Sequence, residues 1–268
     1  MMKKLPVLFI LFLLLLLSGC TTSPTGRSQL MMISEESAIT QSAQAYAQTM
    51  NEYAQKGQLS SDQALIDRVN RITGRLIYEA LIMRPDTRQW NWSMKVIEEP
   101  KTVNAWSMAG GRMALYTGLV EKIKPTDDEL AQVLAHEIAH ALAKHTAEKM
   151  SVAMASSLGI LAVAVATDNR NIATGASAAA LMAITLPNSR TAESEADEIG
   201  IELAARAGYD PHAAVTLWQK MSKESGGSSF DFLSTHPSSE KRIERLNALA
   251  PGVMHYYEEQ RPHPVYPL

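Results

Sequence analysis

Hydrophobic positions along this chain follow two different periods. In one segment they recur every three or four residues, at Leu65, Val69, Ile72 and Leu76. In the next they occupy every second residue, at Trp90, Trp92, Met94 and Val96. The first spacing is typical of a helix with one buried face, and the second of a half-buried strand. Both kinds of element are therefore expected in this chain.

Capping residues indicate where several helices begin. A polar, Ala-rich helix is predicted over residues 34–56. Ser60 with Gln63 forms a capping box that begins the next helix. A second capping box, Thr126 with Glu129, begins a later helix that carries the candidate chemistry.

A small sheet is expected early in the chain. Two extended segments, 104–108 and 112–117, flank Gly110-Gly111, which predicts a tight turn or bulge between them. Later helices are predicted from about 191 to 208, after Asp210-Pro211, and over 239–249, where Pro251 should end the last one. The fold class is therefore α+β and mostly helical.

The first 20 residues have the pattern of a secretion signal. Two lysines precede an apolar run of 13 residues, shorter than the about 20 that span a bilayer, and Leu17-Ser18-Gly19-Cys20 follows. These four residues resemble a bacterial lipobox, which implies that residues 1–19 are removed as a signal peptide and that Cys20 is lipidated. The alternative is an ordinary cleaved signal followed by a free cysteine. Thr21 after the cysteine favours the outer membrane, with the rest of the chain facing the periplasm.

The remaining chain is expected to comprise a lipidated polar tether over 20–29, one folded domain over 30–250 and a Pro-rich tail over 251–268. Two apolar stretches, 151–166 and 172–187, are rich in Ala, Ser and Gly. We expect close-packed helices there, because the lipid already supplies an anchor. A membrane-inserted hairpin is the alternative.

Composition excludes several classes of protein. The 25 Lys and Arg residues nearly balance the 28 Asp and Glu residues, and no basic block is present, so a nucleic-acid partner is not expected. One cysteine excludes an internal disulfide, a four-cysteine zinc cage and a CxxC redox pair.

A metal-binding motif lies on the helix that begins at Thr126. His136 and His140 are four residues apart, so both imidazoles leave one face of the helix and can reach the same ion. Glu137 lies beside that face, where it can take a proton from a metal-activated water. His145 is off the ligand face and is expected in solvent. The motif predicts hydrolysis by water without a covalent intermediate.

The motif does not supply a third protein ligand. Its longer form requires Gly and His at positions that hold Ala143 and Thr146 here, so that form is excluded. A later segment offers Glu193 and Asp197 on one helix face and Glu195 on the opposite face. From spacing alone Glu193 and Glu195 are rivals, and a merely solvated acidic helix is the alternative to both.

Taken together, these motifs resemble the HtpX-like and CAAX-endopeptidase-like family of zinc metalloproteases, most closely its bacterial periplasmic lipoprotein branch. The matching residues, in family order, are Asn104-Ala105, Gly110-Gly111, Thr117-Gly118-Leu119, the HExxH motif at 136–140, Ser189-Arg190, Glu193, Ala196-Asp197, His236-Pro237 and Arg242-Ile243. The resemblance implies a zincin-type domain with one zinc ion per chain. It also implies that Glu193 is the third ligand and that Asp197 orients the imidazole of His136. Ala109 stands where the family often has proline.

The resemblance implies further roles. Asn104, Ala105 and Trp106 would belong to an edge strand that pairs with an extended substrate, unless this is an ordinary sheet edge. His236 either caps the last helix, donates to the developing oxyanion, or plugs the open position of the metal. Arg190 either stabilises charge or pairs with local acids.

We therefore expect a zinc endopeptidase of the bacterial cell envelope that degrades misfolded or misassembled envelope proteins. Its partners would be unfolded substrates and, through Cys20, the membrane. A periplasmic chaperone or assembly factor for outer-membrane proteins is one alternative. An integral membrane protease that spans through residues 151–187 is another.

Overall fold

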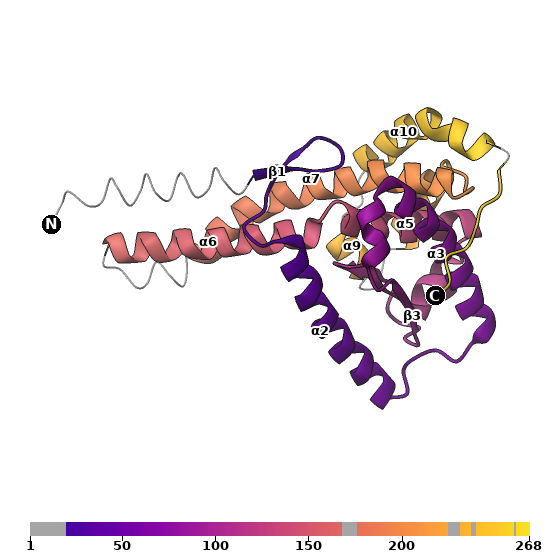
Figure 1. Ribbon diagram of the computed structural model, residues 1–268, viewed down its shortest axis with the longest axis horizontal. Coiled ribbons are helices and arrows are strands. Elements are labelled where there is room, and N and C mark those ends of the chain that lie inside the picture. Colours follow the sequence, from indigo (N-terminus) through magenta and orange to yellow (C-terminus); the bar gives the residue numbers. More distant parts are fainter. Residues whose placement is uncertain (1–19, 168–175, 225–230, 237–239, 260) are drawn as a thin grey trace. The chain divides into compact units, whose positions relative to one another are not determined.

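A computed structural model of the chain describes residues 20–167, 176–224, 231–236, 240–259 and 261–268 (Figure 1). The predicted signal peptide, residues 1–19, lies outside the described residues. The elements in chain order are β1 (Cys20–Thr22), β2 (Ser28–Leu30), α2 (Glu35–Gln55), α3 (Gln63–Met83), a 3₁₀ helix η1 (Pro85–Gln89), β3 (Ser93–Ile97), β4 (Ala105–Met108), β5 (Arg112–Tyr116), α4 (Thr117–Ile123), α5 (Asp127–Leu142), α6 (His145–Thr167), α7 (Ala176–Arg206), α8 (Ala213–Glu224), α9 (Asp231–Thr235) and α10 (Glu240–Glu258). This content confirms the predicted α+β, mostly helical class.

The chain divides into two compact units. Unit 1 comprises Met1–Ala38 and Lys144–Thr191, and unit 2 comprises Ile39–Ala143 and Ala192–Leu268. The HExxH motif and the acidic segment from Glu193 onward both fall in unit 2. The single domain expected over 30–250 stays a prediction.

Unit 2 is built on a three-stranded sheet with the order β3-β5-β4. β3 runs parallel to the central strand β5, and β4 runs antiparallel to it. Gly110 and Gly111 form the turn between β4 and β5 with φ angles of 83° and 74°, as predicted. At Gly111 a Cβ atom would lie 2.3 Å from the ring of Trp92, so a side chain there is excluded by space as well as by backbone angle.

The two faces of the sheet are buried against different helices. Met113 and Leu115 of β5 belong to the main core, which includes residues of α3 and α5. Ala114, between them, faces a smaller core that contains Tyr46 of α2. The sheet is therefore covered on both faces, and β4 is left as an edge strand of unit 2.

Helix boundaries agree with the sequence only in part. Thr126 and Glu129 form both bonds of the predicted capping box at the start of α5. The capping box expected at Ser60 is wrong: Asp62 caps α3 by accepting from the backbone N–H of Leu65 at 3.1 Å. The helix expected from about 191 is the second part of α7, which runs without interruption from Ala176.

The last helix continues past the proline that was expected to end it. Pro251 lies inside α10, which extends to Glu258, so one backbone hydrogen bond is lost without stopping the helix. The turns after it are held by Tyr256, whose ring centroid lies 3.7 Å from the guanidinium carbon of Arg206. Further along, the backbone N–H of Tyr266 donates to the carbonyl of Gly74 in α3 at 3.0 Å.

Unit 1 contains the segment that was predicted as a tether. β1 and β2 pair antiparallel, with Cys20 opposite Leu30, so residues 20–30 form a hairpin. Arg27 and Gln29 both bond to the buried Glu148 of α6, Arg27 through two contacts of 2.6 and 2.7 Å. The predicted tether is therefore folded onto a helix of the same unit.

Two other expectations concern unit 1. His145, expected in solvent, is only 7% exposed, so that expectation is wrong. In α6 Ser151 and Val152 are buried, whereas Met154 and Leu158 are exposed. Within the described ranges, none of the helices combines the length and the apolarity needed to cross a bilayer.

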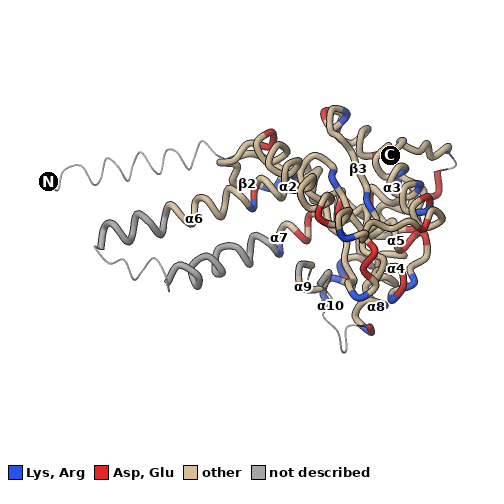
Figure 2. The backbone as a smooth tube through the Cα atoms, turned by 90° about the horizontal axis from the view of Figure 1, so that it is seen from below, with Lys and Arg blue, Asp and Glu red and all other residues tan. Residues whose placement is uncertain are grey.

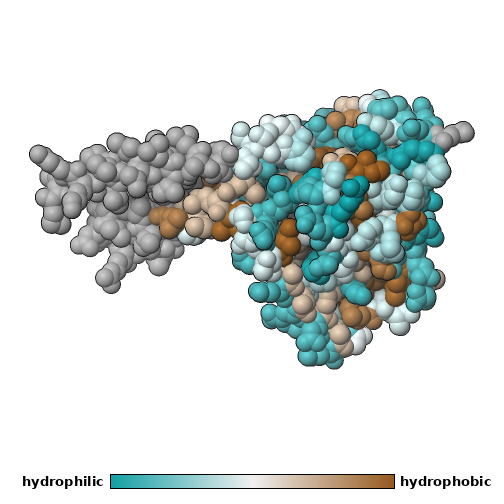
Figure 3. Space-filling view, in the orientation of Figure 1, coloured by the Kyte–Doolittle hydropathy of each residue, from teal (hydrophilic) through white to brown (hydrophobic). Residues whose placement is uncertain are grey.

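Charged and hydrophobic residues are mixed over the surface of unit 2. Lys and Arg alternate with Asp and Glu along its backbone (Figure 2). On the face shown in Figure 3, brown hydrophobic residues are scattered among hydrophilic ones. This distribution is consistent with the absence of a basic block in the sequence, and the expectation of no nucleic-acid partner stays a prediction.

Candidate metal centre

Helices α5 and α7 bring two imidazoles and one carboxylate together. The Nε2 atoms of His136 and His140 lie 3.1 Å apart. One oxygen of Glu193 lies 3.2 Å from Nε2 of His136, and the other lies 3.3 Å from Nε2 of His140. Glu195, the rival in the sequence, is buried but does not belong to this cluster. Folding therefore selects Glu193 as the acid that faces the HExxH histidines.

A third imidazole completes the cluster. Nδ1 of His236 lies 3.2 Å from Nε2 of His136 and 2.9 Å from an oxygen of Glu193. One ligand atom from each of the four side chains lies within 4.8 Å of all the others. Four ligands about 2.0–2.2 Å from a tetrahedral zinc ion are separated by about 3.4 Å, so the observed spacing fits a single zinc ion.

The charges of the cluster also favour a cation. Burial raises the pKa of Glu193, but hydrogen bonds from His136, His140 and His236 outweigh it and hold that pKa well below its usual range. Burial lowers the pKa of His136, but its bonds to Asp197 and Glu193 outweigh it and raise the pKa to about 9. Both shifts mean that the carboxylates stabilise positive charge among these side chains, which is the property a zinc site requires.

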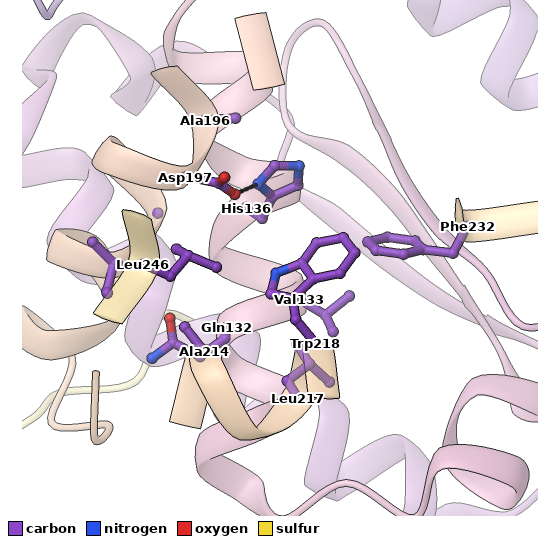
Figure 4. A pocket seen from close by; sticks show the side chains of 12 residues that line it. Gln132, Val133, His136, Ala196, Asp197, Ala214, Leu217, Trp218, Phe232 and Leu246 are labelled. Carbon is purple, nitrogen blue, oxygen red and sulfur yellow. Dashed lines mark ion pairs between the residues drawn. The ribbon is translucent and has the colours of Figure 1, made fainter. Parts of the chain in front are cut away.

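The opposite edge of the His136 ring is held by an ion pair. Oδ1 of Asp197 lies 3.1 Å from Nδ1 of His136. Arg242 donates to both oxygens of Asp197, at 2.7 and 2.9 Å, and its guanidinium carbon lies 3.7 Å from the ring centroid of Trp218. Asp197, His136 and Trp218 line one pocket, which Phe232 also borders (Figure 4). The sequence placed Arg242 in a motif without giving it a role, and only its distance of six residues from His236 could have drawn attention to it.

Glu137 lies beside the ligands and is almost fully buried. Its side chain is 4% exposed, and burial raises the pKa of its carboxyl group. Oε1 has no hydrogen-bond partner among the described residues, although Nε2 of His236 lies 3.3 Å from it. The backbone of Ser107 in β4 hydrogen-bonds to the same carboxylate. A buried carboxylate oxygen without a partner, next to a cation site, is suited to hold a water molecule or its proton.

Strand β4 directs alternate backbone groups toward the site. The carbonyl of Asn104 accepts from the N–H of Tyr116 in the adjoining segment, whereas the carbonyl of Val103 accepts from the N–H of Phe232 at 3.0 Å. Backbone groups alternate sides along a strand, so Ala105 points its N–H and C=O to the outer edge, and Trp106 does not. Of the three predicted substrate residues, Ala105 is therefore the one placed for backbone pairing.

The other predicted residues are not part of the cluster. Arg190 is exposed and belongs to unit 1. Cys20 begins β1, and Pro237 lies outside the described residues. The roles predicted for Arg190 and Cys20 stay predictions.

Comparison with known proteins identifies the family. The sequence model of peptidase family M48 matches residues 63–250, which is more than half of the chain. The chain belongs to peptidase family M48. Metalloproteases of this family use zinc, and the cluster around His136 is the group of described side chains that could hold such an ion.

Several relatives of this M48 chain share part of their length with it. The mitochondrial metalloendopeptidase OMA1 of Schizosaccharomyces pombe is 37% identical over 211 residues, which cover 77% of this chain and 59% of the relative. The mitochondrial metalloendopeptidase OMA1 of Homo sapiens is 32% identical over 261 residues, 91% of this chain and 48% of its own. The beta-barrel assembly-enhancing protease of Escherichia coli is 31% identical over 175 residues, 59% of this chain and 35% of its own. The chain thus spans about half or less of most relatives it matches.

Proposed function

We propose that this M48 peptidase works in the bacterial cell envelope, where it degrades unfolded or misassembled envelope proteins. The observation that carries the peptidase chemistry is the position of Glu137: a buried carboxylate oxygen without a described hydrogen-bond partner lies next to four converging metal-ligand atoms. The envelope setting rests on the signal-like residues 1–19 and on the Leu-Ser-Gly-Cys sequence that ends at Cys20. These sequence features support the proposal that the protein belongs to the lipoprotein branch of the family.

Three side chains would hold the metal during turnover. His136 and His140 would offer their Nε2 atoms, and Glu193 its carboxylate. When bound, zinc supplies Lewis-acid activation of a water molecule and of the scissile carbonyl. Asp197 accepts the Nδ1 proton of His136 and so keeps the Nε2 lone pair directed at the ion.

Glu137 would move the proton. Its raised pKa brings the carboxylate closer to the acidity of an activated water, so it can take that proton and later give it to the leaving amine. The bond from the Ser107 backbone fixes the carboxylate relative to β4. The carboxylate of Glu137, as the base, and strand β4, as the proposed substrate-binding strand, are therefore held in a fixed position relative to each other.

The substrate would pair with β4 as an added strand. Ala105 directs its N–H and C=O away from β5, and because the residue is only 1% exposed, pairing would require the covering residues to move aside. Backbone pairing of this kind selects an extended chain more than a particular side-chain sequence. Folded proteins leave few backbone N–H and C=O groups free for such pairing, whereas unfolded chains present many. The geometry thus supports unfolded chains as the substrate class.

His236 would act as a reversible plug. Its Nδ1 lies within 3.2 Å of Nε2 of His136 and of one oxygen of Glu193, so it takes the fourth place in the cluster. A neutral imidazole there closes the fourth position, and its withdrawal opens it. Of the three roles predicted for His236, this one has the support of its place in the cluster.

Hydrolysis of casein by the purified chain, measured with zinc content before and after treatment with a chelator, tests the proposal. We expect about one zinc ion per chain and activity that disappears with the metal and returns with added zinc. A zinc-loaded protein that cleaves no unfolded substrate would instead favour the alternative of a chaperone or assembly factor. In that case a Glu137→Gln chain would still rescue cells that lack the protein.

Fractionation of cells tests the envelope setting separately. The wild-type chain should sediment with outer membranes and incorporate labelled palmitate, and a Cys20→Ala chain should do neither. Retention of Cys20→Ala in the membrane pellet after alkaline extraction would favour the membrane-spanning alternative.

A further inference from the structure

Helices α5 and α7 come into close backbone contact at Gly200. A Cβ atom built on Gly200 would lie 3.1 Å from both Cα and N of His136, and 3.3 Å from the carbonyl carbon of Ala135. Distances in this range are shorter than ordinary van der Waals contact. The backbones of the two helices therefore meet directly, with the first zinc-motif histidine at the crossing.

The same face of α7 carries the two acids of the site. Glu193, Asp197 and Gly200 are separated by four and three residues, so they follow one another along the side of the helix that faces α5. Ala196 and Ala204, which flank the crossing on α7, are fully buried. The separation of the helices at Gly200 is thus transmitted directly to the acids one and two turns away.

The contacts of Asp197 and Glu193 with His136 tolerate little increase in distance. Asp197 lies 3.1 Å from Nδ1 of His136, and Glu193 lies 3.2 Å from its Nε2. A hydrogen bond weakens rapidly beyond about 3.2 Å, and metal–ligand distances tolerate about 0.2 Å. The atoms that a new Cβ would meet are backbone atoms of a buried helix, so α7 would have to move by a few tenths of an ångström. That shift equals or exceeds the tolerance of the site.

We propose that Gly200 is a positioning residue of the zinc centre: the missing side chain sets the helix separation at which Asp197 and Glu193 reach His136. The inference rests on the proposed ligand set. It makes Gly200 responsible for zinc affinity and not for the stability of α7, which alanine would favour as a better helix former than glycine.

The test compares Gly200→Ala with Gly252→Ala in the full chain. Gly252 also lies in a helix, and a Cβ there would meet nothing within 4 Å, so this control has the same change in helix propensity without the crossing. Zinc affinity is measured by competition with a chromophoric chelator. We expect the zinc Kd of Gly200→Ala to rise about 10- to 100-fold, as for loss of a residue that orients a ligand, and that of Gly252→Ala to stay at the wild-type value.

A second measurement separates positioning from general damage. The unfolding midpoint of zinc-free Gly200→Ala should stay close to that of the zinc-free wild type, because the gain in helix propensity offsets the cost of the close contact. The visible spectrum of its cobalt form should change in intensity. An unchanged zinc Kd in Gly200→Ala would overturn the inference and leave the proposed function intact. Loss of helical signal in this variant would also overturn it, because Gly200 would then serve the fold as a whole. A wild-type chain without zinc affinity would overturn both.

Discussion

Asp197 and His136 share the contact that joins the acidic segment of α7 to the zinc motif of α5. Oδ1 of Asp197 lies 3.1 Å from Nδ1 of His136, on the ring edge away from the cluster, while Nε2 of the same ring faces Glu193 at 3.2 Å. Arg242 holds Asp197 from behind with two hydrogen bonds. The ring is therefore held in one orientation, with Nδ1 toward Asp197 and Nε2 toward Glu193, before any ligand arrives.

Replacing Asp197 by Asn should weaken zinc binding without abolishing it. The amide has about the same size but accepts the Nδ1 proton less strongly, and it removes the ion pair between Arg242 and position 197. We expect the zinc Kd to rise about 10- to 100-fold. Chelator competition measures it, with exposed Glu198→Gln on the same helix as the matched control. Equal affinities for wild type and Asp197→Asn would contradict the role given to this contact.

Replacing Glu137 by Gln should separate metal binding from catalysis. The amide that replaces the carboxylate cannot take up a proton, whereas the four ligand atoms of the cluster are untouched. Zinc content should stay at about one ion per chain, and kcat for casein should fall about 10²- to 10⁴-fold. Metal analysis measures the zinc content and a peptidase assay on the same preparation measures kcat. Wild-type turnover would show that another group moves the proton.

The pair Glu193→Gln and Glu195→Gln decides which acid binds zinc. Both side chains lie on α7, but only Glu193 faces His136 and His140. Glu193→Gln should lose most of its zinc under dialysis, and Glu195→Gln should retain it. His140→Ala serves as the positive control for metal loss. Retention of zinc by Glu193→Gln together with its loss from Glu195→Gln would reverse the assignment.

Replacing His236 by Ala should raise activity if the imidazole is a plug. The substitution opens the fourth position of the cluster and removes a neighbour of Glu137. We expect kcat/KM for casein to increase several-fold, with a smaller increase in zinc Kd. A fall in kcat without a change in metal affinity would instead identify His236 as a donor to the oxyanion.

Glu129 should make stability depend on acid pH. Burial raises its pKa, but hydrogen bonds from Lys220, the Thr126 backbone and Thr216 outweigh it and lower the folded-state pKa below the usual 4.5. As the pH falls, the Glu129 carboxylate therefore takes up its proton in the unfolded state before it does so in the folded state. The stabilisation from Glu129 is complete above about pH 4.5 and is lost as the pH falls through the folded pKa.

The variant Glu129→Gln should show how much the charged carboxylate stabilises the fold and how that stabilisation depends on pH. At pH 7 its free energy of unfolding should be about 1–3 kcal/mol below that of the wild type, and the gap should narrow as the pH falls below 4.5. Urea titrations across that range measure it, and exposed Glu121→Gln is the control. A gap that is constant with pH would mean that the charge of Glu129 contributes nothing.

Local patterns in the sequence predicted most elements of unit 2. The alternation from Trp90 to Val96 anticipated β3, and the paired glycines anticipated the turn between β4 and β5. Each of these signals acts between residues a few positions apart, so backbone geometry alone makes them reliable. Helix ends were less certain, because Asp62 and Ser60 compete for one cap, and because packing on Arg206 supports α10 beyond Pro251.

The sequence by itself determined that two histidines one helical turn apart share a face with a glutamate beside them. This follows from the helical repeat and holds wherever that helix lies. Only the tertiary structure decided that Glu193 and not Glu195 meets them, that His236 joins them, and that Arg242 holds Asp197 behind them. These residues lie far from the motif along the chain. Glu193 and Asp197 reach it through the packing of α7 against α5, whereas His236 and Arg242 come from the region of α9 and α10, and no local pattern encodes either approach.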